Sequence, residues 1–191
     1  TSTAHRVNPN WVYGFAELTG QHEKIKTANR LAVPGCHATG YIALVRPLIE
    51  KGLLAADYPL SCHSLTGYSG GGKAMIAEYE ADIRAEKYDA PRAYGLSLTH
   101  KHLPEMQALT GAQQPPIFTP VVADYYSGML VTVPIPLSAL QAVKSGKQIA
   151  KMLADYYQGA PLIQVHPFAQ LPEDGMLNAN ALSGKDNLEI F

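Results

Sequence analysis

Apolar residues recur at helical spacing in four segments and form short runs elsewhere in the chain. The helical pattern predicts helices over residues 39–54, 72–87, 104–110 and 138–158. Runs rich in branched and aromatic residues predict strands over residues 59–68, 92–99, 117–123, 128–135, 162–166 and 187–191. Pro47 would kink or interrupt the first helix, Ser138 would cap the last one, and Gly159 would end it.

The predicted strands and helices follow one another in irregular order. Long strands with non-alternating connections favour an α+β fold, with a mixed, largely antiparallel sheet and helices on one face. The other face of such a sheet often supports a partner subunit, so we expect a homodimer or homotetramer.

The segment Pro34-Gly35-Cys36-His37-Ala38-Thr39 places a cysteine between a Pro-Gly turn and the first predicted helix. A thiol at a helix N-terminus faces free backbone N–H groups and the positive end of the helix dipole, which favour an anion. We therefore expect a lowered Cys36 pKa and a good nucleophile at neutral pH. A buried structural cysteine is the alternative that this motif leaves open.

A second motif, His100-Lys101-His102-Leu103-Pro104-Glu105, joins a predicted strand to a predicted helix. His102 would lie at the junction, where a helix N-terminus keeps an imidazole neutral, as a general base requires. We expect His100 to point in a different direction, because strand residues alternate. Glu105 lies within reach of the same helix face and would orient the ring or the substrate. A solvated loop is the alternative for this segment alone.

The glycine-rich segment from Gly67 to Lys73 matches Gly-x-x-x-x-Gly-Lys. Ala74 stands where a phosphate-binding loop needs Ser or Thr to hold magnesium, which argues against a nucleoside triphosphatase. The glycines would still let a flat or anionic ligand approach the backbone closely. A flexible hairpin end is the alternative.

Composition narrows the class of protein. The 191 residues carry a net charge of −1, and their 15 Lys and Arg are scattered, which gives no basic surface for nucleic acid. Two distant cysteines without a signal peptide indicate a cytoplasmic protein. No apolar run approaches the roughly 20 residues of a membrane span. The pairs Cys36-His37 and Cys62-His63 suit a tetrahedral zinc site poorly, so we expect no metal.

Four segments occur in the order found in the N-acetyl-gamma-glutamyl-phosphate reductase family, which the chain resembles over nearly its whole length. They are residues 12–18, 34–40, 69–73 and 100–105. Many members carry Asn-Pro-Gly-Cys-Tyr-Pro-Thr where this chain has Val-Pro-Gly-Cys-His-Ala-Thr at residues 33–39, a version that resembles the shorter class of the family. Contacts of that Asn and Tyr cannot be transferred to this chain.

The resemblance implies a fold like the C-terminal domain of glyceraldehyde-phosphate dehydrogenase and the reduction of an acyl phosphate in arginine biosynthesis. Cys36 would attack the acyl phosphate, phosphate would leave, and NADPH would reduce the thioester to a semialdehyde. By its place in the family motif, His102 would be the base for the thiol and the acid for the hemithioacetal oxygen.

The resemblance also implies binding residues. Tyr94 and Glu105 match positions that support the site, and Ser2 and Arg6 match a Ser-x-x-x-Arg element near the substrate phosphate. The NADP-binding candidates lie in the glycine-rich segment and in the loop at residues 174–187; they are Ser69, Gly70, Gly71 and Asn180.

No Gly-x-Gly-x-x-Gly follows an early strand, and no strand–helix–strand nucleotide unit precedes Cys36. We therefore expect residues 1–191 to form the catalytic and dimerisation domain of a reductase whose dinucleotide-binding domain lies outside this sequence, and the isolated chain to be inactive. Two other classes stay open. A cofactor-independent cysteine amidase or thioesterase would also need Cys36 and His102, whereas a non-catalytic dimerisation module would tolerate loss of Cys36.

Overall fold

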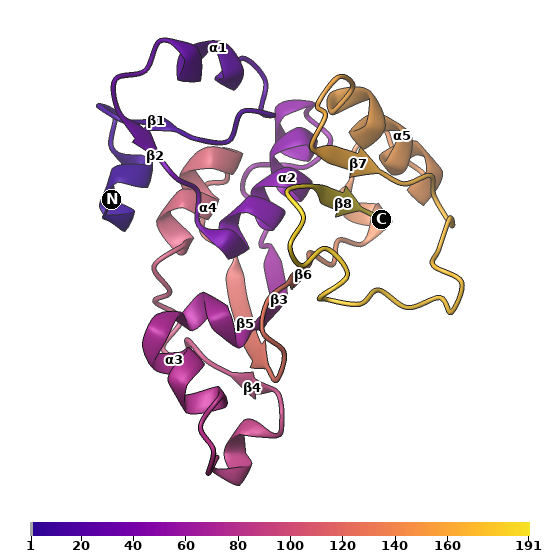
Figure 1. Cartoon of the computed structure of the whole chain (residues 1–191). Coiled ribbons are helices and arrows are strands. Elements are labelled where there is room, and N and C mark those ends of the chain that lie inside the picture. Colours follow the sequence, from indigo (N-terminus) through magenta and orange to yellow (C-terminus); the bar gives the residue numbers. More distant parts are fainter. Residues whose placement is uncertain (1) are drawn as a thin grey trace.

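A computed structural model describes residues 2–191 (Figure 1). The helices are α1 (Gln21–Lys26), α2 (Cys36–Glu50), α3 (Gly72–Tyr79), α4 (Leu103–Thr110) and α5 (Gly146–Tyr156). The strands are β1 (Val12–Tyr13), β2 (Leu31–Ala32), β3 (Ser61–Gly67), β4 (Arg92–Ala93), β5 (Ile117–Ala123), β6 (Met129–Thr132), β7 (Ile163–Val165) and β8 (Leu188–Ile190). Short 3-10 helices occupy Thr3–Val7, Tyr68–Gly71, Glu86–Tyr88 and Leu137–Ala139.

The largest sheet has the strand order β4-β5-β3-β6. β6 pairs antiparallel with β3, and β4 pairs antiparallel with β5. The central pair, β3 and β5, is parallel from Ser61 opposite Ile117 to Gly67 opposite Ala123. This direction is possible because the long connection between these strands contains α3 and α4 and crosses back over the sheet. The α+β class and the mixed sheet are confirmed.

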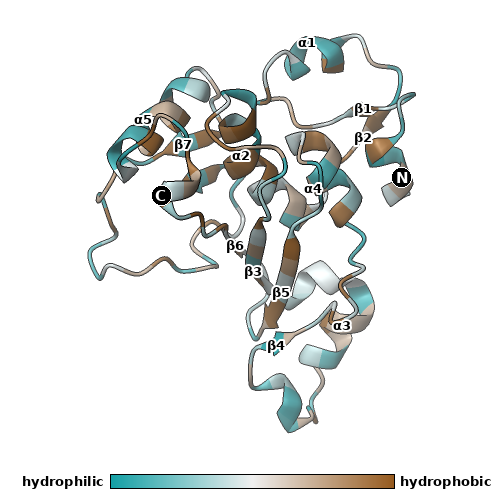
Figure 2. Ribbon diagram, turned by 180° about the vertical axis from the view of Figure 1, so that it is seen from behind, coloured by the Kyte–Doolittle hydropathy of each residue, from teal (hydrophilic) through white to brown (hydrophobic). Residues whose placement is uncertain are grey.

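Alternation along the central strands gives the sheet one buried face. In β3, Cys62, Ser64 and Thr66 are buried, while His63 and Leu65 face solvent. Helices α2 and α4 pack against each other on the buried side, and α2 also contacts β6 (Figure 1). Hydrophobic colouring follows β5 and much of α2 (Figure 2), because both contribute to the core.

The main core forms around α2. Tyr41, Ile42 and Val45 of this helix are fully buried and belong to one cluster with Met106 of α4 and Phe118 of β5. Helix α5 and the parallel pair β7–β8 lie beside α2, and the parallel pair β1–β2 lies near α4 (Figure 1). The core therefore holds α2 in place from its first turn onward.

The prediction for the last helix is wrong at its start. Leu137–Ala139 form a 3-10 turn, and Leu140 is extended and bridges Leu54. Since this bridge uses the backbone, the helix cannot begin at Ser138. Instead Ser145 caps α5, with its Oγ accepting a 3.4 Å hydrogen bond from the N–H of Gln148. The helix ends at Tyr156, before Gly159.

Two other predicted elements are shorter in the structure. The strand predicted over residues 92–99 ends at Ala93, because the chain turns at Gly95 and Leu98, both of which have positive φ. The helix predicted over residues 72–87 ends at Tyr79. The first helix, in contrast, begins three residues earlier than predicted, at Cys36, and continues through Pro47.

Candidate functional site

Cys36 is the first residue of α2. Gly35 is the N-cap, with φ −74° and ψ 141°, and its carbonyl accepts hydrogen bonds from the N–H of Thr39 (2.9 Å) and the Thr39 hydroxyl (3.0 Å). The Cys36 side chain is exposed, whereas Cys62 is fully buried in β3. The predicted position of Cys36 at a helix start is confirmed, and it is the accessible thiol of the two.

The prediction of a lowered thiol pKa is wrong. Although the side chain reaches solvent, burial of the sulfur among its neighbours raises the pKa of Cys36. The backbone N–H groups of His37 and Cys36 act in the opposite direction, as expected at a helix N-terminus, and so do the charges of Lys101 and Arg6. Because burial outweighs them, the free thiol is protonated at neutral pH and its activation needs a base.

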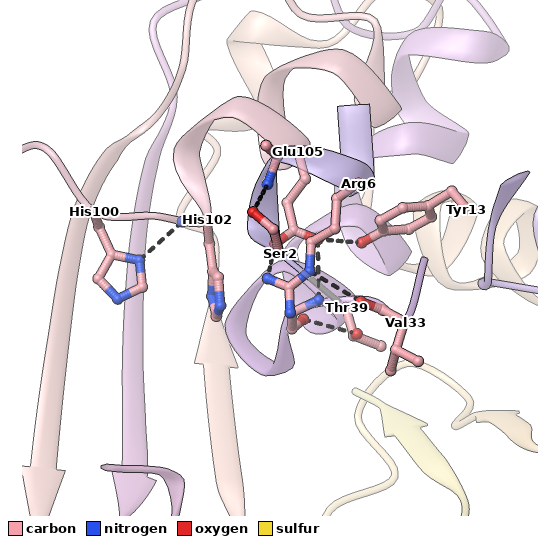
Figure 3. Close-up of polar contacts among 10 residues, drawn as sticks. Ser2, Arg6, Tyr13, Val33, Thr39, His100, His102 and Glu105 are labelled. Atoms are coloured by element: carbon pink, nitrogen blue, oxygen red, sulfur yellow. Dashed lines mark hydrogen bonds and ion pairs between the residues drawn. The ribbon is translucent and has the colours of Figure 1, made fainter. Parts of the chain in front are cut away.

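Glu105 is a buried carboxylate that connects separate parts of the chain (Figure 3). Its Oε1 accepts a 2.6 Å hydrogen bond from Arg6 Nη1, and its Oε2 accepts from Tyr13 Oη (2.6 Å) and from the N–H of Gly35 (3.0 Å). Three donors, one of them charged, compensate the burial of this carboxylate. Burial, followed by the bond to Glu105, raises the pKa of Tyr13 far above its ordinary value. Glu105 therefore holds the turn that carries Cys36.

Gly35 leaves no room for a side chain. A Cβ at this position would contact Glu105 Oε1 and would lie 2.6 Å from His102 Nε2 and 2.7 Å from Arg6 Nη1. Real Cβ atoms do not approach other heavy atoms this closely. The glycine before the cysteine is thus required by close packing against His102 and Glu105.

His102 caps α4 and is followed by Pro104 in the first turn, as its motif predicted. It is 3% exposed, and burial, followed by the nearby His100 and His37, lowers the pKa of His102 to about 3. The imidazole is therefore neutral at pH 7, as expected. Its Nδ1 is buried and has no hydrogen-bond partner within residues 2–191. A buried polar atom in this state is available to a ligand.

His100 lies beside His102, so the expectation that it points in a different direction is wrong. The two ring centroids are 4.7 Å apart, and both residues line one pocket. His100 Nδ1 accepts a 3.2 Å hydrogen bond from the backbone N–H of His102 (Figure 3). Burial lowers the pKa of His100. The neutral ring must then carry its proton on Nε2, which makes His100 a hydrogen-bond donor.

A cavity of about 120 Å³ brings together half of the predicted site residues, including the predicted nucleophile and base. Its lining residues come from α2, β3, the glycine-rich segment, α3, the segment after β4, and β5; they are Cys36, His37, Thr66, Gly67, Gly70, Gly71, Met75, Tyr94, His100, Lys101, His102 and Val122. A larger, open hollow of about 390 Å³ between Lys51 and α5 contains none of the predicted residues. We take the smaller cavity as the candidate site because it contains both the exposed thiol and the neutral imidazole.

Ser2 and Arg6 lie outside the lining of this cavity. Ser2 caps the first 3-10 helix, with its Oγ accepting from the N–H of Ala4 (3.3 Å). Arg6 Nε donates to the carbonyl of Val33 (2.9 Å), and Arg6 Nη1 pairs with Glu105. Arg6 is thus engaged with groups next to the turn before Cys36, whereas Ser2 is engaged within its own 3-10 helix.

The glycine-rich segment and the loop at residues 174–187 both contact the turn that joins β5 to β6. The backbone N–H groups of Gly67 and Ser69 donate to the carbonyls of Gly128 and Tyr126. Gly128 of that same turn also lies against the loop at residues 174–187, because a Cβ built on it would be 2.6 Å from the Cα of Asn180. Gly70 and Gly71 reach the cavity, whereas Ser69 and Asn180 do not line it.

His37 is a cavity residue that the sequence analysis did not assign to the site. Its Nδ1 lies 2.7 Å from Ser64 Oγ and its Nε2 lies 2.6 Å from Tyr94 Oη. Burial lowers the pKa of His37 to about 4, so this imidazole is also neutral at pH 7. Its position directly after Cys36, where many members of the resembled family have tyrosine, was the available signal.

No group of three or more His, Cys, Asp or Glu side chains in residues 2–191 is arranged to hold a metal ion. Over the same residues, no helix has both the length and the apolar character needed to cross a membrane.

The chain is similar to known proteins over its whole length. It is 46% identical over 193 residues to the N-acetyl-gamma-glutamyl-phosphate reductase of Brucella anthropi, covering 100% of this chain and 62% of that protein. The corresponding Brucella suis protein is 46% identical over 194 residues, with the same shares covered. The resemblance found in the sequence is confirmed, and the chain spans 62% of the length of these curated relatives.

Solved structures share the fold. Aspartate semialdehyde dehydrogenase II from Vibrio cholerae matches with a TM-score of 0.68 at 16% identity, over 96% of this chain and 58% of that one. The aspartate semialdehyde dehydrogenase from Francisella tularensis matches with a TM-score of 0.61 at 12% identity, over 96% and 61% of the two chains. A family model described as "Semialdehyde dehydrogenase, dimerisation domain" matches residues 36–190. The chain therefore belongs to the semialdehyde dehydrogenase dimerisation-domain family.

Proposed function

We propose that this chain forms the catalytic and dimerisation part of an NADP-dependent reductase acting in the cytoplasm. The enzyme would convert N-acetyl-glutamyl phosphate to its semialdehyde in arginine biosynthesis. The observation that carries the proposal is the shared cavity of an exposed Cys36 and a neutral His102. The names of the curated relatives supply the substrate class.

The first step is an acyl transfer to Cys36. The sulfur forms a bond to the carbonyl carbon of the acyl phosphate, the bond from that carbon to the phosphate oxygen breaks, and phosphate leaves. The thiol proton passes to His102. Transfer is unfavourable in the free protein, because the pKa of Cys36 is raised and that of His102 is lowered. An anionic acyl phosphate beside the ring would favour the protonated imidazole and so make the transfer easier.

The donors around Cys36 suit the charge that develops on the carbonyl oxygen. The N–H groups at the start of α2 already act on the sulfur, and His100, which lines the same cavity, carries an Nε2–H. Such donors stabilise a tetrahedral oxyanion in acyl transfer. After reduction of the thioester, His102 returns its proton to the hemithioacetal oxygen. The carbon–sulfur bond then breaks, and the proton passes back to the sulfur as the aldehyde leaves.

The cavity is too small for a whole dinucleotide, and we propose that it receives the reacting end. Gly70 and Gly71 border it without side chains, and a Cβ at Gly71 would collide with Met75, so the backbone there must stay bare. A volume of about 120 Å³ is well below the roughly 300–1,000 Å³ of a complete ligand pocket. When bound, NADPH supplies the hydride that reduces the thioester. Its remaining contacts would come from a dinucleotide-binding domain of the same protein, with Ser69 and Asn180 as further candidates at the edge of the site.

We also propose that the protein is a homodimer or homotetramer. The open face of the sheet carries neighbouring apolar side chains, with Leu65 opposite Val121 in β5 and opposite Leu130 in β6. Leu65 is 37% exposed and Ile117 of the same face is 63% exposed. A symmetric pair of such faces would bury both. The name of the family model, a dimerisation domain, supports this arrangement.

The proposal is tested by turnover of the protein that carries this chain. With N-acetyl-glutamyl phosphate, oxidation of NADPH should be observed, should require Cys36 and should release phosphate in equal amount. Cys36→Ser should abolish it, whereas Cys62→Ser, at the buried thiol, should retain it. Hydrolysis of an amide or thioester without nucleotide would instead identify a cysteine hydrolase. Full NADPH oxidation by the Cys36→Ser variant would show that the reaction does not use this thiol, and the chain would then serve for dimerisation alone.

A further inference from the structure

Two hydrogen bonds join Ser64 to His37 and His37 to Tyr94, and the Ser64 hydroxyl decides which atom donates in each of them. Ser64 is fully buried in β3, and the hydrogen-bond partner of its Oγ within residues 2–191 is His37 Nδ1, at 2.7 Å. A hydroxyl hydrogen buried without an acceptor is costly, whereas a hydroxyl oxygen with a spare lone pair costs less. Ser64 must therefore donate its hydrogen to Nδ1.

The tautomer of His37 follows from this direction. With Nδ1 acting as acceptor, a neutral imidazole carries its proton on Nε2. Nε2 lies 2.6 Å from Tyr94 Oη, so His37 donates to the tyrosine oxygen. The Tyr94 hydrogen is then not used by His37. Because Tyr94 lines the cavity that contains Cys36, this hydrogen is free to point toward a ligand there.

The surroundings of His37 keep the ring in this state. Its ring is packed against Phe118 at a centroid distance of 5.2 Å and against His100 at 5.6 Å, both edge-on. The ring is 3% exposed. The two nitrogens of the imidazole contact Ser64 and Tyr94, one each, whereas a tyrosine at this position would offer a single oxygen at its tip.

We propose that Ser64 and His37 are positioning residues that direct the Tyr94 O–H into the cavity, where it donates a hydrogen bond to the oxygen of the acyl group on Cys36. This inference rests on the proposed reductase function. Each donor in the series Ser64, His37, Tyr94 polarises the next one, so the terminal O–H is a stronger donor than an isolated phenol. Burial raises the pKa of Tyr94 to about 12, which keeps the phenol protonated as a donor must be.

Two measurements test the inference. The first is the tautomer of His37, read from the ring nitrogen shifts of the histidine-labelled protein at neutral pH without substrate. A proton on Nε2 is expected, and a proton on Nδ1 would overturn the proposal, because Tyr94 would then donate to His37. This result does not depend on catalytic activity.

The second measurement is a double-mutant cycle on turnover. Tyr94→Phe should lower kcat at least about tenfold with little change in KM, as expected for loss of a donor to the developing oxyanion. Ser64→Ala should lower kcat about threefold or more when Tyr94 is present and have no further effect in the Tyr94→Phe background. Ser61→Ala, on the same strand but outside the cavity lining, is the matched control and should behave like the unaltered protein.

The outcomes separate the two proposals. Equal losses from Ser64→Ala in both backgrounds would show a merely structural role for the serine and overturn the inference. An unaltered protein that fails to oxidise NADPH with the acyl phosphate would reject the reductase function itself, and with it the step that Tyr94 is inferred to assist.

Discussion

The backbone N–H of Gly35 donates a 3.0 Å hydrogen bond to Oε2 of Glu105, across 70 positions of sequence. Gly35 precedes the thiol at the start of α2, and Glu105 lies in the first turn of α4, which His102 caps. One hydrogen bond therefore joins the starts of the two helices that carry the nucleophile and the base. The same carboxylate also accepts hydrogen bonds from Arg6 and Tyr13, so its removal would break contacts to the first 3-10 helix and to β1 as well.

Glu105→Ala should lower the free energy of unfolding by about 3–5 kcal/mol, because it leaves the partly buried guanidinium of Arg6 and the buried Tyr13 hydroxyl without their acceptor. Glu105→Gln keeps an oxygen acceptor and should cost less. Denaturant unfolding monitored by circular dichroism measures both. Glu23→Gln, which removes an exposed ion pair with Lys26, is the control and should change stability by less than about 0.5 kcal/mol. A Glu105→Ala effect as small as that of the control would contradict the assigned role.

Gly35→Ala should destabilise the protein and displace the catalytic pair, because the added Cβ overlaps Glu105 and approaches His102 Nε2. Overpacking of this kind typically costs about 1–3 kcal/mol. Gly70→Ala is the comparison for stability: the nearest atom to its Cβ, Thr66 Oγ1, would lie at 3.4 Å, and no strained backbone angle is involved. In thermal unfolding, Gly35→Ala should have the lower midpoint temperature of the two variants. Equal midpoints would show that the turn at Gly35 can shift to accept a Cβ without loss of stability.

Alkylation of the folded protein with iodoacetamide should modify Cys36 and spare Cys62, since only the former is exposed. Because burial raises the pKa of Cys36, the rate should increase through a midpoint above the 9.0 of an ordinary thiol. Peptide mapping by mass spectrometry over a series of pH values gives the site and the midpoint. Cys36→Ser should remove the reaction. A midpoint below 9.0 would show that the helix N-terminus outweighs burial after all.

Mild acid should destabilise the fold through two buried histidines, His37 and His102. Burial lowers the pKa of His37 to about 4 and that of His102 to about 3, below the ordinary value of 6.5. As pH falls below about 6.5, the unfolded chain binds protons at both residues and the folded protein does not. The free energy of unfolding should therefore fall by about 2 kcal/mol per histidine between pH 7 and pH 5.

The slope is measured by denaturant unfolding at several pH values in that range. His37→Gln should make the slope shallower, because one of the two buried neutral imidazoles is gone. His22→Gln replaces an exposed histidine of α1 and controls for the substitution itself. An unchanged slope in His37→Gln would mean that His37 does not stay neutral in the folded protein.

His102→Ala should lower turnover of the protein that carries this chain by about a hundredfold or more, as expected for loss of a general base. His100→Ala should lower it less, since the neutral His100 acts as a donor and not as the base. The ratio of the two kcat values at one pH decides the assignment. If His100→Ala were the more damaging change, the roles within the pair would have to be exchanged.

The local features of the site were predictable from neighbouring residues. Pro34 and Gly35 placed Cys36 at a helix start, Pro104 placed His102 at another, and strand β5 was predicted with its observed limits. Such features depend on backbone preferences and on the period of apolar side chains, which the sequence shows directly.

The long-range features were not predictable in the same way. The start of α5 depended on the bridge between Leu140 and Leu54, and the direction of the Cys36 pKa shift depended on how much protein surrounds the sulfur. The partners of His37 come from a strand and a loop distant in sequence. Motif order indicates which residues share a function, but burial and hydrogen bonding arise only when distant segments pack together, and these decide which nitrogen holds a proton and which thiol needs a base.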